Sequence, residues 1–490
     1  MSPAITETGG ARRLPFLAVG SALCVLYGLT LCPTVYWYDS AEFAAHATSL
    51  GVPHPPGYPL YTLIAHLFTY LPIEPALGVN LMSLVFGVAS CLLVLWLTAY
   101  PLASAERPRL IGGIVAALTL GTTPTFWANS VVTEVYTPGL FFTLLTLALL
   151  LQAGRQRRPR WVVLAGLVGG LGVGVHMSIA TFGLGYAWLV LTHPQAGAKA
   201  KPTRAAFALT VKSALAAAAG LLVFAYVPLR SFTTWSRREW IGFIKNSTGG
   251  TFKRRFLRDY DLSERTLQVW NIFVDNLQYV GLLLCVVGLV ILLKTRRRAA
   301  IALLLGAAGN LYWFFNYRVP DLDVFFLPAI AAMCICIGVA ADELGDLLGR
   351  RRRHAPAIGL LALGLAGASI ANNYQRVDLS QATQAATYGA TLCETIEENA
   401  IIAHYSSPDE WRFYSVLLYQ QEGLHLRPDV ELWRKPKPRD LIAKVKSGAA
   451  VYMFGDPPRR LRHRLQAEPE GPLMRLRMRQ RPLNTRASEK

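Results

Sequence analysis

The chain has few charged residues for its length. Asp, Glu, Lys and Arg make up 16% of the 490 residues, whereas an ordinary soluble domain has roughly 25%. Hydrophobic residues reach 53%, and many of them are gathered in runs of about twenty, which is the length that crosses a bilayer. The composition excludes a soluble globular protein and predicts an all-α polytopic membrane protein.

Cysteine pairs and metal-ligand spacings are also missing. Six of the seven cysteines lie in or at the end of apolar runs, and no C-x-x-C pair or Cys/His spacing occurs. The sequence therefore predicts no disulfide framework and no structural metal site. No convincing nucleotide-binding fingerprint is present either, so we expect neither a nucleotide nor a redox cofactor, and dependence on a divalent metal stays open.

The net charge of +19 has a topological explanation. Many Lys and Arg residues lie in short loops between apolar runs, as the positive-inside rule expects, so we predict no nucleic-acid partner. Arg12 and Arg13 place the N-terminus in the cytoplasm, and no cleavage site follows the first run, which indicates an uncleaved span. Residues 33–75 contain no Lys or Arg, which indicates a loop on the outside.

Counting loops by side gives about eleven transmembrane helices with the N-terminus inside. Within the first outside loop, Tyr58–Leu71 is apolar but too short to cross, so we expect it to lie in the interface or to re-enter. The predicted spans are Leu14–Cys32, Ala76–Leu97, Leu110–Trp127, Pro138–Leu151, two short spans within Trp161–Thr192 that turn near His176, Ala205–Val227, Ile272–Leu293, Ala299–Phe315, Val324–Ala341 and Ala357–Ala371.

The predicted organisation has two parts. Residues 1–371 form the transmembrane domain, with outside loops at 33–75 and 229–270. Residues 372–490 form an extracytoplasmic soluble region with a small α/β module, and its last thirty residues, rich in Arg, are expected to be a disordered tail. The loop 229–270 carries nine Lys and Arg against four Asp and Glu. This excess fits a surface helix on anionic lipid headgroups or groups that bind phosphate.

Two carboxylates follow the first span. If Ser40 to Leu50 is helical, Asp39, Glu42 and His46 share one face. Acidic groups at the edge of a bilayer are costly and indicate function. The alternative is that Asp39 is an N-cap with Glu42 as its capping-box partner, and that Gly51 ends the helix.

The motifs around these acids resemble a known family. DSAE followed by LGVPHPPGYPLYTLIAHLF resembles the D-S-G-E…L-G-V-A-H-P-P-G-Y-P-L-F-T-L signature of the bacterial relatives of eukaryotic transmembrane protein O-mannosyltransferases, within the GT-C superfamily of membrane glycosyltransferases. TPTFWANSVVTEVYTPG, YVPLRS, NYRVPDLDVFFLP and, more weakly, AHYSSPDEW…LRPDV extend the resemblance to about residue 435. The sequence departs from the family at Tyr38 and Ala41, where glycine is usual.

The resemblance implies a GT-C-like fold and a glycosyltransferase. Such an enzyme transfers a sugar, here mannose by the eukaryotic resemblance, from a polyprenyl-phosphate donor to a hydroxyl of a protein Ser/Thr or a glycan, with inversion. It implies protein O-mannosylation at the extracytoplasmic face of the inner (plasma) membrane, with membrane lipid as a further partner. Two alternatives are a transporter or flippase of lipid-linked sugars and a non-catalytic membrane assembly protein.

The resemblance also implies roles for particular residues. Asp39 is the expected general base, and Glu42 shares or assists that role or orients the acceptor. His54 and Tyr58, in the HPPGY turn, are expected to contact substrate, and the alternative for His54 is a structural role in the turn. His176, in an apolar run, is a further substrate contact or a hydrogen-bonded packing residue.

Three further candidates lie in other outside loops. Glu134 is expected to contact the sugar or acceptor, or else to be a solvated loop acid. Arg230 and Arg318 are the expected phosphate ligands. Arg318 has a structural alternative, in which it forms ion pairs with Asp321 and Asp323.

Overall fold

The computed structural model describes residues 9–103, 108–194, 204–233, 235–247, 256, 261–349, 355–405 and 408–479. The chain divides into two compact units, and each draws on distant parts of the sequence. The first comprises Met1–Cys32, Val52–Phe68 and Gly78–Gln381, and the second comprises Pro33–Gly51, Thr69–Leu77 and Ala382–Lys490. The candidate carboxylates Asp39 and Glu42 therefore belong to the second unit, with the carboxyl-terminal region.

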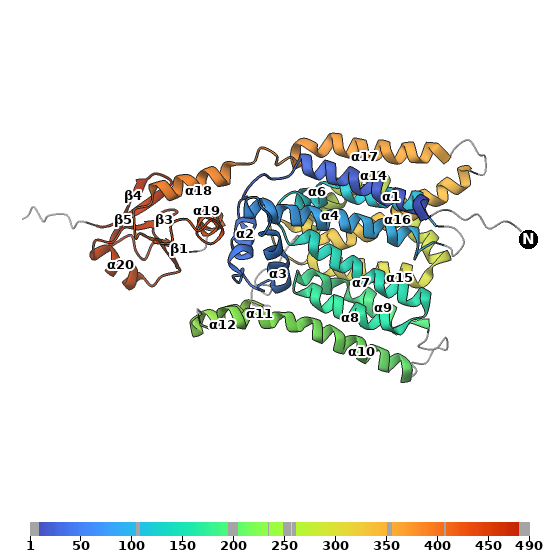
Figure 1. Ribbon diagram of the computed structural model, residues 1–490, viewed down its shortest axis with the longest axis horizontal. Coiled ribbons are helices and arrows are strands. Elements are labelled where there is room, and N and C mark those ends of the chain that lie inside the picture. Colours follow the sequence, from blue (N-terminus) through green and yellow to red (C-terminus); the bar gives the residue numbers. More distant parts are fainter. Residues whose placement is uncertain are drawn as a thin grey trace, which may run out of the picture. The chain divides into compact units, whose positions relative to one another are not determined.

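The first unit is built of helices (Figure 1). Among the described residues, six helices are long and apolar enough to span a membrane, or seven if one bent pair counts as a span. These helices confirm a multi-pass, mostly helical protein. The helices are α1 (Gly9–Leu29), α3 (Pro59–Phe68), α4 (Pro75–Ala99), α5 (Leu110–Thr122), α6 (Pro124–Ser130), α7 (Tyr136–Gln156), α8 (Pro159–Val173), η1 (Met177–Phe182), α9 (Gly183–Leu191), α10 (Arg204–Leu221), η3 (Leu222–Ala225), α11 (Tyr226–Ser231), α12 (Arg237–Lys245), α14 (Leu262–Thr295), α15 (Arg297–Phe315), η5 (Leu322–Phe326), α16 (Leu327–Gly349) and α17 (Ala355–Val377).

Most helices follow the apolar runs of the sequence, with one clear difference. The predicted third span is broken: α5 and α6 meet at an angle of 72°. Thr123, between them, has extended backbone angles (φ −63°, ψ 136°) and Pro124 opens α6. A proline disfavours helical angles in the residue before it, because its Cδ collides with that residue's backbone. The proline therefore bends this predicted span into two helices.

Small residues bring helices of the first unit close together. Gly112 of α5 lies against the backbone of Gly338 in α16, and a β-carbon on either residue would overlap the other helix. Gly288 of α14 lies in the same way against Cys336 of α16. In a bilayer the hydrophobic effect does not favour contact between helices, because lipid tails are as apolar as the side chains. Close approach of this kind allows the van der Waals packing that helps helices to associate there.

The second unit contains a five-stranded sheet with the order β2-β1-β3-β5-β4. Strand β1 (Ile401–His404) lies between β2 (Glu431–Arg434) and β3 (Val451–Met453) and runs parallel to both. The other elements are α18 (Gln384–Thr395), α19 (Pro408–Leu418), η6 (Tyr419–Gly423), α20 (Pro438–Lys446), β4 (Leu465–Glu470) and β5 (Leu473–Met478). Figure 1 shows α18, α19 and α20 around the strands. This sheet confirms the expected α/β module.

The carboxyl-terminal part of the module differs from the sequence prediction. The expected disordered tail begins instead with an antiparallel hairpin of β4 and β5, which pair from Leu465–Met478 to Glu470–Leu473. Apolar and arginine side chains alternate along MRLRM, a period of two that is typical of a strand. The high Arg content hid this pattern. Residues 480–490, also within the predicted tail, lie outside the described residues.

The segment Pro33–Gly51 contributes one helix to the second unit. Helix α2 (Asp39–Ser49) buries the alanines Ala41, Ala44 and Ala45 in a cluster with Tyr414 and Tyr419 of the carboxyl-terminal region. Ala41, one of the departures from the family motif, is fully buried there. The motif helix is therefore built into the core of the α/β unit.

Candidate functional site

The start of α2 places Asp39 in the first helical position. The N-cap is Tyr38, whose side chain makes no capping hydrogen bond. The interpretation of Asp39 as an N-cap with Glu42 as its capping-box partner is therefore wrong. Tyr38 has φ 58° and ψ −131°, a conformation that glycine adopts easily and other residues rarely do. This geometry gives a physical reason for the family glycine at this position. The helix ends at Ser49, and the residue that caps it in the left-handed region is Leu50 rather than Gly51.

Asp39 and Glu42 lie one turn apart with their carboxylates close together. An oxygen of one lies within 4.8 Å of an oxygen of the other. Asp39 is half-buried, and Glu42 is only 3% exposed. The indole Nε1 of Trp411 donates a hydrogen bond to Oδ1 of Asp39 at 2.8 Å. Buried carboxylates are uncommon unless hydrogen-bonded, so this pair is the strongest candidate for chemistry in the second unit.

His46 joins the same face of α2 to the carboxyl-terminal region. Its Nδ1 lies 3.0 Å from Oε2 of Glu422, and its Nε2 lies 3.9 Å from Oε1 of Glu42. Ser49 donates a second hydrogen bond to Glu422 at 2.6 Å. Burial raises the pKa of Glu422, but the hydrogen bonds from His46 and Ser49 outweigh burial and hold that pKa below its ordinary value. Asp39, Glu42 and His46 thus lie on one face of α2, as predicted, and their side chains form a polar cluster with Glu422.

The substrate-contact candidates of the first unit form an aromatic group. His54 Nε2 lies 3.0 Å from the hydroxyl of Tyr58, and the Tyr58 ring stacks on His176 with centroids 6.1 Å apart. His176 also meets the edge of Tyr136 at 5.2 Å. Nδ1 of His176 accepts a hydrogen bond from the backbone N–H of Ser178 at 3.2 Å. Three residues predicted from two separate parts of the sequence, His54 and Tyr58 from the HPPGY turn and His176 from an apolar run, are therefore neighbours.

The remaining candidates occupy different surroundings within the first unit. Glu134 is half-buried. Burial raises the pKa of the Tyr61 hydroxyl, and the charge of Glu134 raises that pKa further. Arg230 is exposed and lies beside Tyr226. Arg318 is exposed within the loop between α15 and η5. Both arginines keep the accessibility that a phosphate ligand needs.

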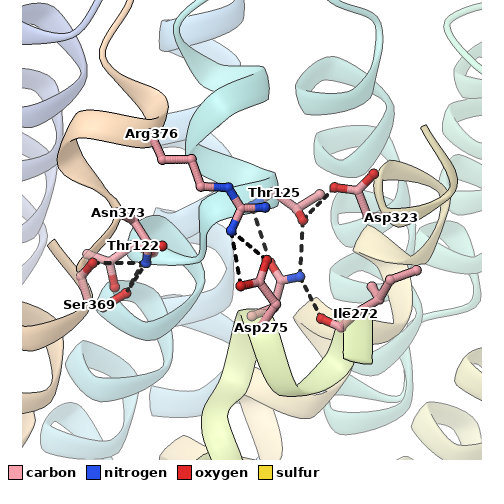
Figure 2. A network of polar contacts seen from close by, with 9 residues as sticks. Thr122, Thr125, Ile272, Asp275, Asp323, Ser369, Asn373 and Arg376 are labelled. Atoms are coloured by element: carbon pink, nitrogen blue, oxygen red, sulfur yellow. Dashed lines mark hydrogen bonds and ion pairs between the residues drawn. The ribbon is translucent and has the colours of Figure 1, made fainter. Parts of the chain in front are cut away.

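In the structural alternative for Arg318, this residue forms ion pairs with Asp321 and Asp323. Both acids make hydrogen bonds to other residues. Asp321 accepts a hydrogen bond from the Tyr136 hydroxyl at 3.0 Å. Asp323 accepts one from the Thr125 hydroxyl at 2.9 Å, and Thr125 in turn accepts one from the Asn276 amide (Figure 2). These bonds connect η5 with α6 and α14 within the first unit.

Figure 2 also shows polar contacts of α17. Arg376 forms an ion pair with Asp275 of α14 at 2.8 Å, and Ser369 donates a hydrogen bond to the carbonyl of Thr122 in α5 at 2.7 Å. Asn373 donates to the carbonyl of Ser369, one turn earlier in α17. Polar side chains between helices are favourable when they are hydrogen-bonded to one another. This network therefore stabilises the packing of α17 against α5 and α14.

Sequence reasoning missed two residues of the carboxylate cluster. Trp411 and Glu422 lie in a region where the family resemblance is weak. Trp411 does belong to the quoted AHYSSPDEW motif, and that was the available signal. Its partner Asp39 is 372 residues away, a distance that no local pattern spans.

The arrangement suits proton transfer better than metal binding within the second unit. A carboxylate accepts a proton from a hydroxyl that lies within hydrogen-bond reach. Asp39 and Glu42 are also oxygen donors of the kind that Mg²⁺ and Ca²⁺ prefer, but those ions take six or more ligands. The expectation of no bound metal stays a prediction.

Comparisons with known proteins point in the same direction as the motif. Residues 39–200 match the family described as the protein O-mannosyl-transferase TMEM260 N-terminal domain. Protein O-mannosyl-transferase TMEM260 of Mus musculus is 26% identical over 454 residues, which cover 85% of this chain and 62% of the mouse protein. The Dictyostelium discoideum protein O-mannosyl-transferase tmem260 is 26% identical over 122 residues, or 24% of this chain and 14% of that protein. The chain thus spans about three fifths of the mouse relative.

Solved structures show the likeness of fold. ArnT from Cupriavidus metallidurans bound to undecaprenyl phosphate matches with a TM-score of 0.61 and 14% identity, over 96% of this chain and 98% of that one. ArnT in the apo state matches with a TM-score of 0.62 and 13% identity, over 95% and 98%. The structural likeness confirms the predicted fold class, and with the sequence relatives it supports the predicted resemblance to the GT-C superfamily of membrane glycosyltransferases.

Proposed function

We propose that this multi-pass protein is a GT-C glycosyltransferase that transfers a sugar, mannose, from a polyprenyl-phosphate donor to a hydroxyl acceptor. The reaction takes place at the extracytoplasmic face of the inner membrane. The observation that carries the proposal is the pair of close carboxylates, Asp39 and Glu42, in a chain with this fold. The O-mannosyl-transferase relatives support the sugar, and the undecaprenyl phosphate bound to ArnT supports the donor class.

The proposed reaction is a single displacement at the anomeric carbon. The acceptor oxygen forms a bond to that carbon while Asp39 takes the hydroxyl proton. The bond between the anomeric carbon and the phosphate oxygen breaks, and its electron pair stays with the lipid phosphate. Glu42 shares or assists this role, since one of its carboxylate oxygens lies within 4.8 Å of one of Asp39. The products are the glycosylated acceptor with inverted configuration, the lipid phosphate and protonated Asp39.

Residues of the first unit are assigned to substrate binding. The side chains of His54, Tyr58 and His176 offer ring faces and polar atoms of the kind that hold a sugar. The carboxylate of Glu134 can accept a further hydrogen bond from a substrate hydroxyl. Arg230 and Arg318 are exposed guanidinium groups, which bind phosphate through charge-assisted hydrogen bonds. The acceptor is a Ser/Thr hydroxyl of an exported protein or a hydroxyl of a glycan.

The test is transfer of radiolabelled sugar by the purified full chain. The protein is given polyprenyl-phosphate sugars and an extract of extracytoplasmic proteins and glycans. We expect Asp39→Asn to lower kcat by about 10²–10⁴-fold and Glu42→Gln to lower it by at least about tenfold, because general base catalysis contributes about 10²–10⁴-fold. Asp440→Asn is the matched control, since Asp440 is also in the first turn of a helix in the second unit.

Each outcome separates one alternative. Undiminished transfer by Asp39→Asn would contradict the base assignment. Movement of the lipid-linked sugar across vesicles without transfer would favour a flippase, and binding with neither activity would favour an assembly protein. A parallel assay with a chelator tests whether a divalent metal is required, and a requirement is shown if transfer stops and returns with added cation.

A further inference from the structure

Trp411 of the carboxyl-terminal module contacts Asp39 directly. Helix α19 follows strand β1 in the chain, and Trp411 lies in the first turn of this helix. Strands β1, β2 and β3 are parallel, and the elements that follow the carboxyl ends of parallel strands commonly carry functional residues. The 2.8 Å bond from the Trp411 indole to Asp39 joins this edge of the module to the candidate base.

The indole ring is held firmly in this position. It stacks on Tyr414 with centroids 5.8 Å apart and planes 25° apart. Tyr414 in turn stacks on buried His404 at 4.1 Å. The guanidinium of Arg434 lies 6.0 Å from the Trp411 ring. These contacts restrict the direction in which the N–H points, and with it the rotation of the Asp39 carboxylate.

The chemistry of indole limits what Trp411 can do. Its Nε1–H donates a hydrogen bond and accepts none, so Trp411 does not take the proton itself. A donor to an ionised carboxylate makes a short, strong bond and fixes one of its oxygens. Proton transfer depends steeply on such alignment.

A purely structural role for the bond is a weaker explanation. Helix α2 is already held by the hydrogen bonds of His46 and Ser49 to Glu422 and by the burial of its alanines. Loss of one N–H leaves these contacts intact. What the indole adds is a fixed direction for the Asp39 carboxylate.

We propose that Trp411 is a positioning residue for Asp39, so that the carboxyl-terminal module completes the active site. The inference rests on the proposed function, because it assigns Asp39 as the base. It extends that function by giving the module a role in the rate of the chemical step.

The test compares Trp411→Phe with Trp433→Phe in the full chain. Phenylalanine keeps an aromatic ring and removes the N–H. Trp433 donates an indole hydrogen bond to Glu431, also at 2.8 Å, so the control loses an equivalent bond elsewhere in the module. We expect Trp411→Phe to lower kcat by about ten to one hundredfold, with KM within about twofold of wild type. We expect the control to match wild type and the two melting temperatures to agree.

A double variant checks that the effect passes through Asp39. If Trp411 acts only by orienting this carboxylate, Trp411→Phe has no further effect on residual transfer in the Asp39→Asn protein. An additive loss would contradict the proposal, as would a Trp411→Phe protein with the kcat of the control.

A spectroscopic measurement separates failure of this inference from failure of the proposed function. The indole ¹⁵N–¹H resonance of Trp411 is identified by its loss in Trp411→Phe. We expect it to move in Asp39→Asn and to stay in place in Asp440→Asn. An unmoved resonance in Asp39→Asn overturns the inference even where the wild type transfers sugar. Absence of any transfer by the wild type overturns the proposed function, and the assigned role of Trp411 with it.

Discussion

At the residue scale, the backbone of Tyr38 is the clearest departure from ordinary geometry in the motif. Its φ of 58° and ψ of −131° belong to a sparsely populated region that costs about 1–3 kcal/mol for residues other than glycine. Its side chain is 43% exposed, so little packing depends on it. The strain is therefore a property of the backbone turn that leads into α2.

Substitutions at Tyr38 should follow this backbone preference. We expect Tyr38→Gly to keep the free energy of unfolding within about 1 kcal/mol of wild type, because relief of strain offsets the flexibility of glycine. Tyr38→Val should lower it by about 1–2 kcal/mol, since a β-branched residue tolerates positive φ worst. Thermal unfolding in detergent measures both. A glycine variant less stable than the valine variant would contradict this explanation.

The contacts of Glu422 with α2 predict that the stability of the protein depends on pH. Its pKa is lowered in the folded protein, so ionised Glu422 stabilises the fold above the unfolded pKa of about 4.3. That contribution is lost as the pH falls through the lower, folded pKa. Because Glu422 is partly exposed, we expect Glu422→Gln to destabilise the protein by only about 1 kcal/mol at pH 7.

The comparison uses an exposed glutamate as its reference. Glu398 is exposed in the same unit, and Glu398→Gln controls for the loss of one charge. The difference in unfolding free energy between the two variants should be present at pH 7 and shrink below about pH 4. A difference that does not change with pH would mean that the shape of the side chain, rather than its charge, holds α2.

At the element scale, sequence reasoning did best where one physical signal dominates. Long apolar runs located α4, α7 and α15, since few other structures use twenty apolar residues. It failed where a weaker local effect decided the geometry. The restriction before Pro124 bent a predicted span, and the alternation along β5 was masked by arginines. Asp39 and Glu42 were recognisable from their motif, whereas Trp411 becomes a partner only when the chain has folded.

The contact between α5 and α16 predicts a large effect from a small change. Gly338→Ala places a methyl group against the backbone of Gly112, where no flexible side chain can move aside. We expect the unfolding free energy to fall by about 1–3 kcal/mol, the usual cost of overpacking. Gly28→Ala is the control, because a β-carbon there meets no atom within 4 Å. Equal melting temperatures for the two variants would mean that these helices separate at little cost.

At the scale of the whole molecule, the second unit is assembled from three separated segments of chain. Pro33–Gly51 and Thr69–Leu77 flank part of the first unit in sequence, yet they pack with residues after Gln381. Glu74 connects the three segments, because its carboxylate accepts hydrogen bonds from the Thr34 hydroxyl at 2.8 Å and from the Tyr419 hydroxyl at 2.9 Å. Sequence reasoning treated 33–75 as one loop because it contains no Lys or Arg, and only long-range packing divides it.

This assembly predicts that α2 depends on the carboxyl-terminal region for its order. A chain that ends at Gln381 lacks Tyr414, Tyr419, Glu422 and Trp411, which bury and bond α2. We therefore expect chymotrypsin to cleave within residues 33–51 at least about tenfold faster than in the full chain, because cleavage follows the population of the open segment. The same truncation should abolish sugar transfer.

The control is a chain that ends at Arg479, which keeps every described strand of the second unit. It should resist cleavage at 33–51 as the full chain does, while circular dichroism reports whether the helices of the first unit persist in the shorter protein. If α2 stays protected after truncation at Gln381, its order comes from its own segment. The module would then act on Asp39 only through the Trp411 hydrogen bond, and Trp411→Phe would reproduce the whole catalytic loss of the truncated chain.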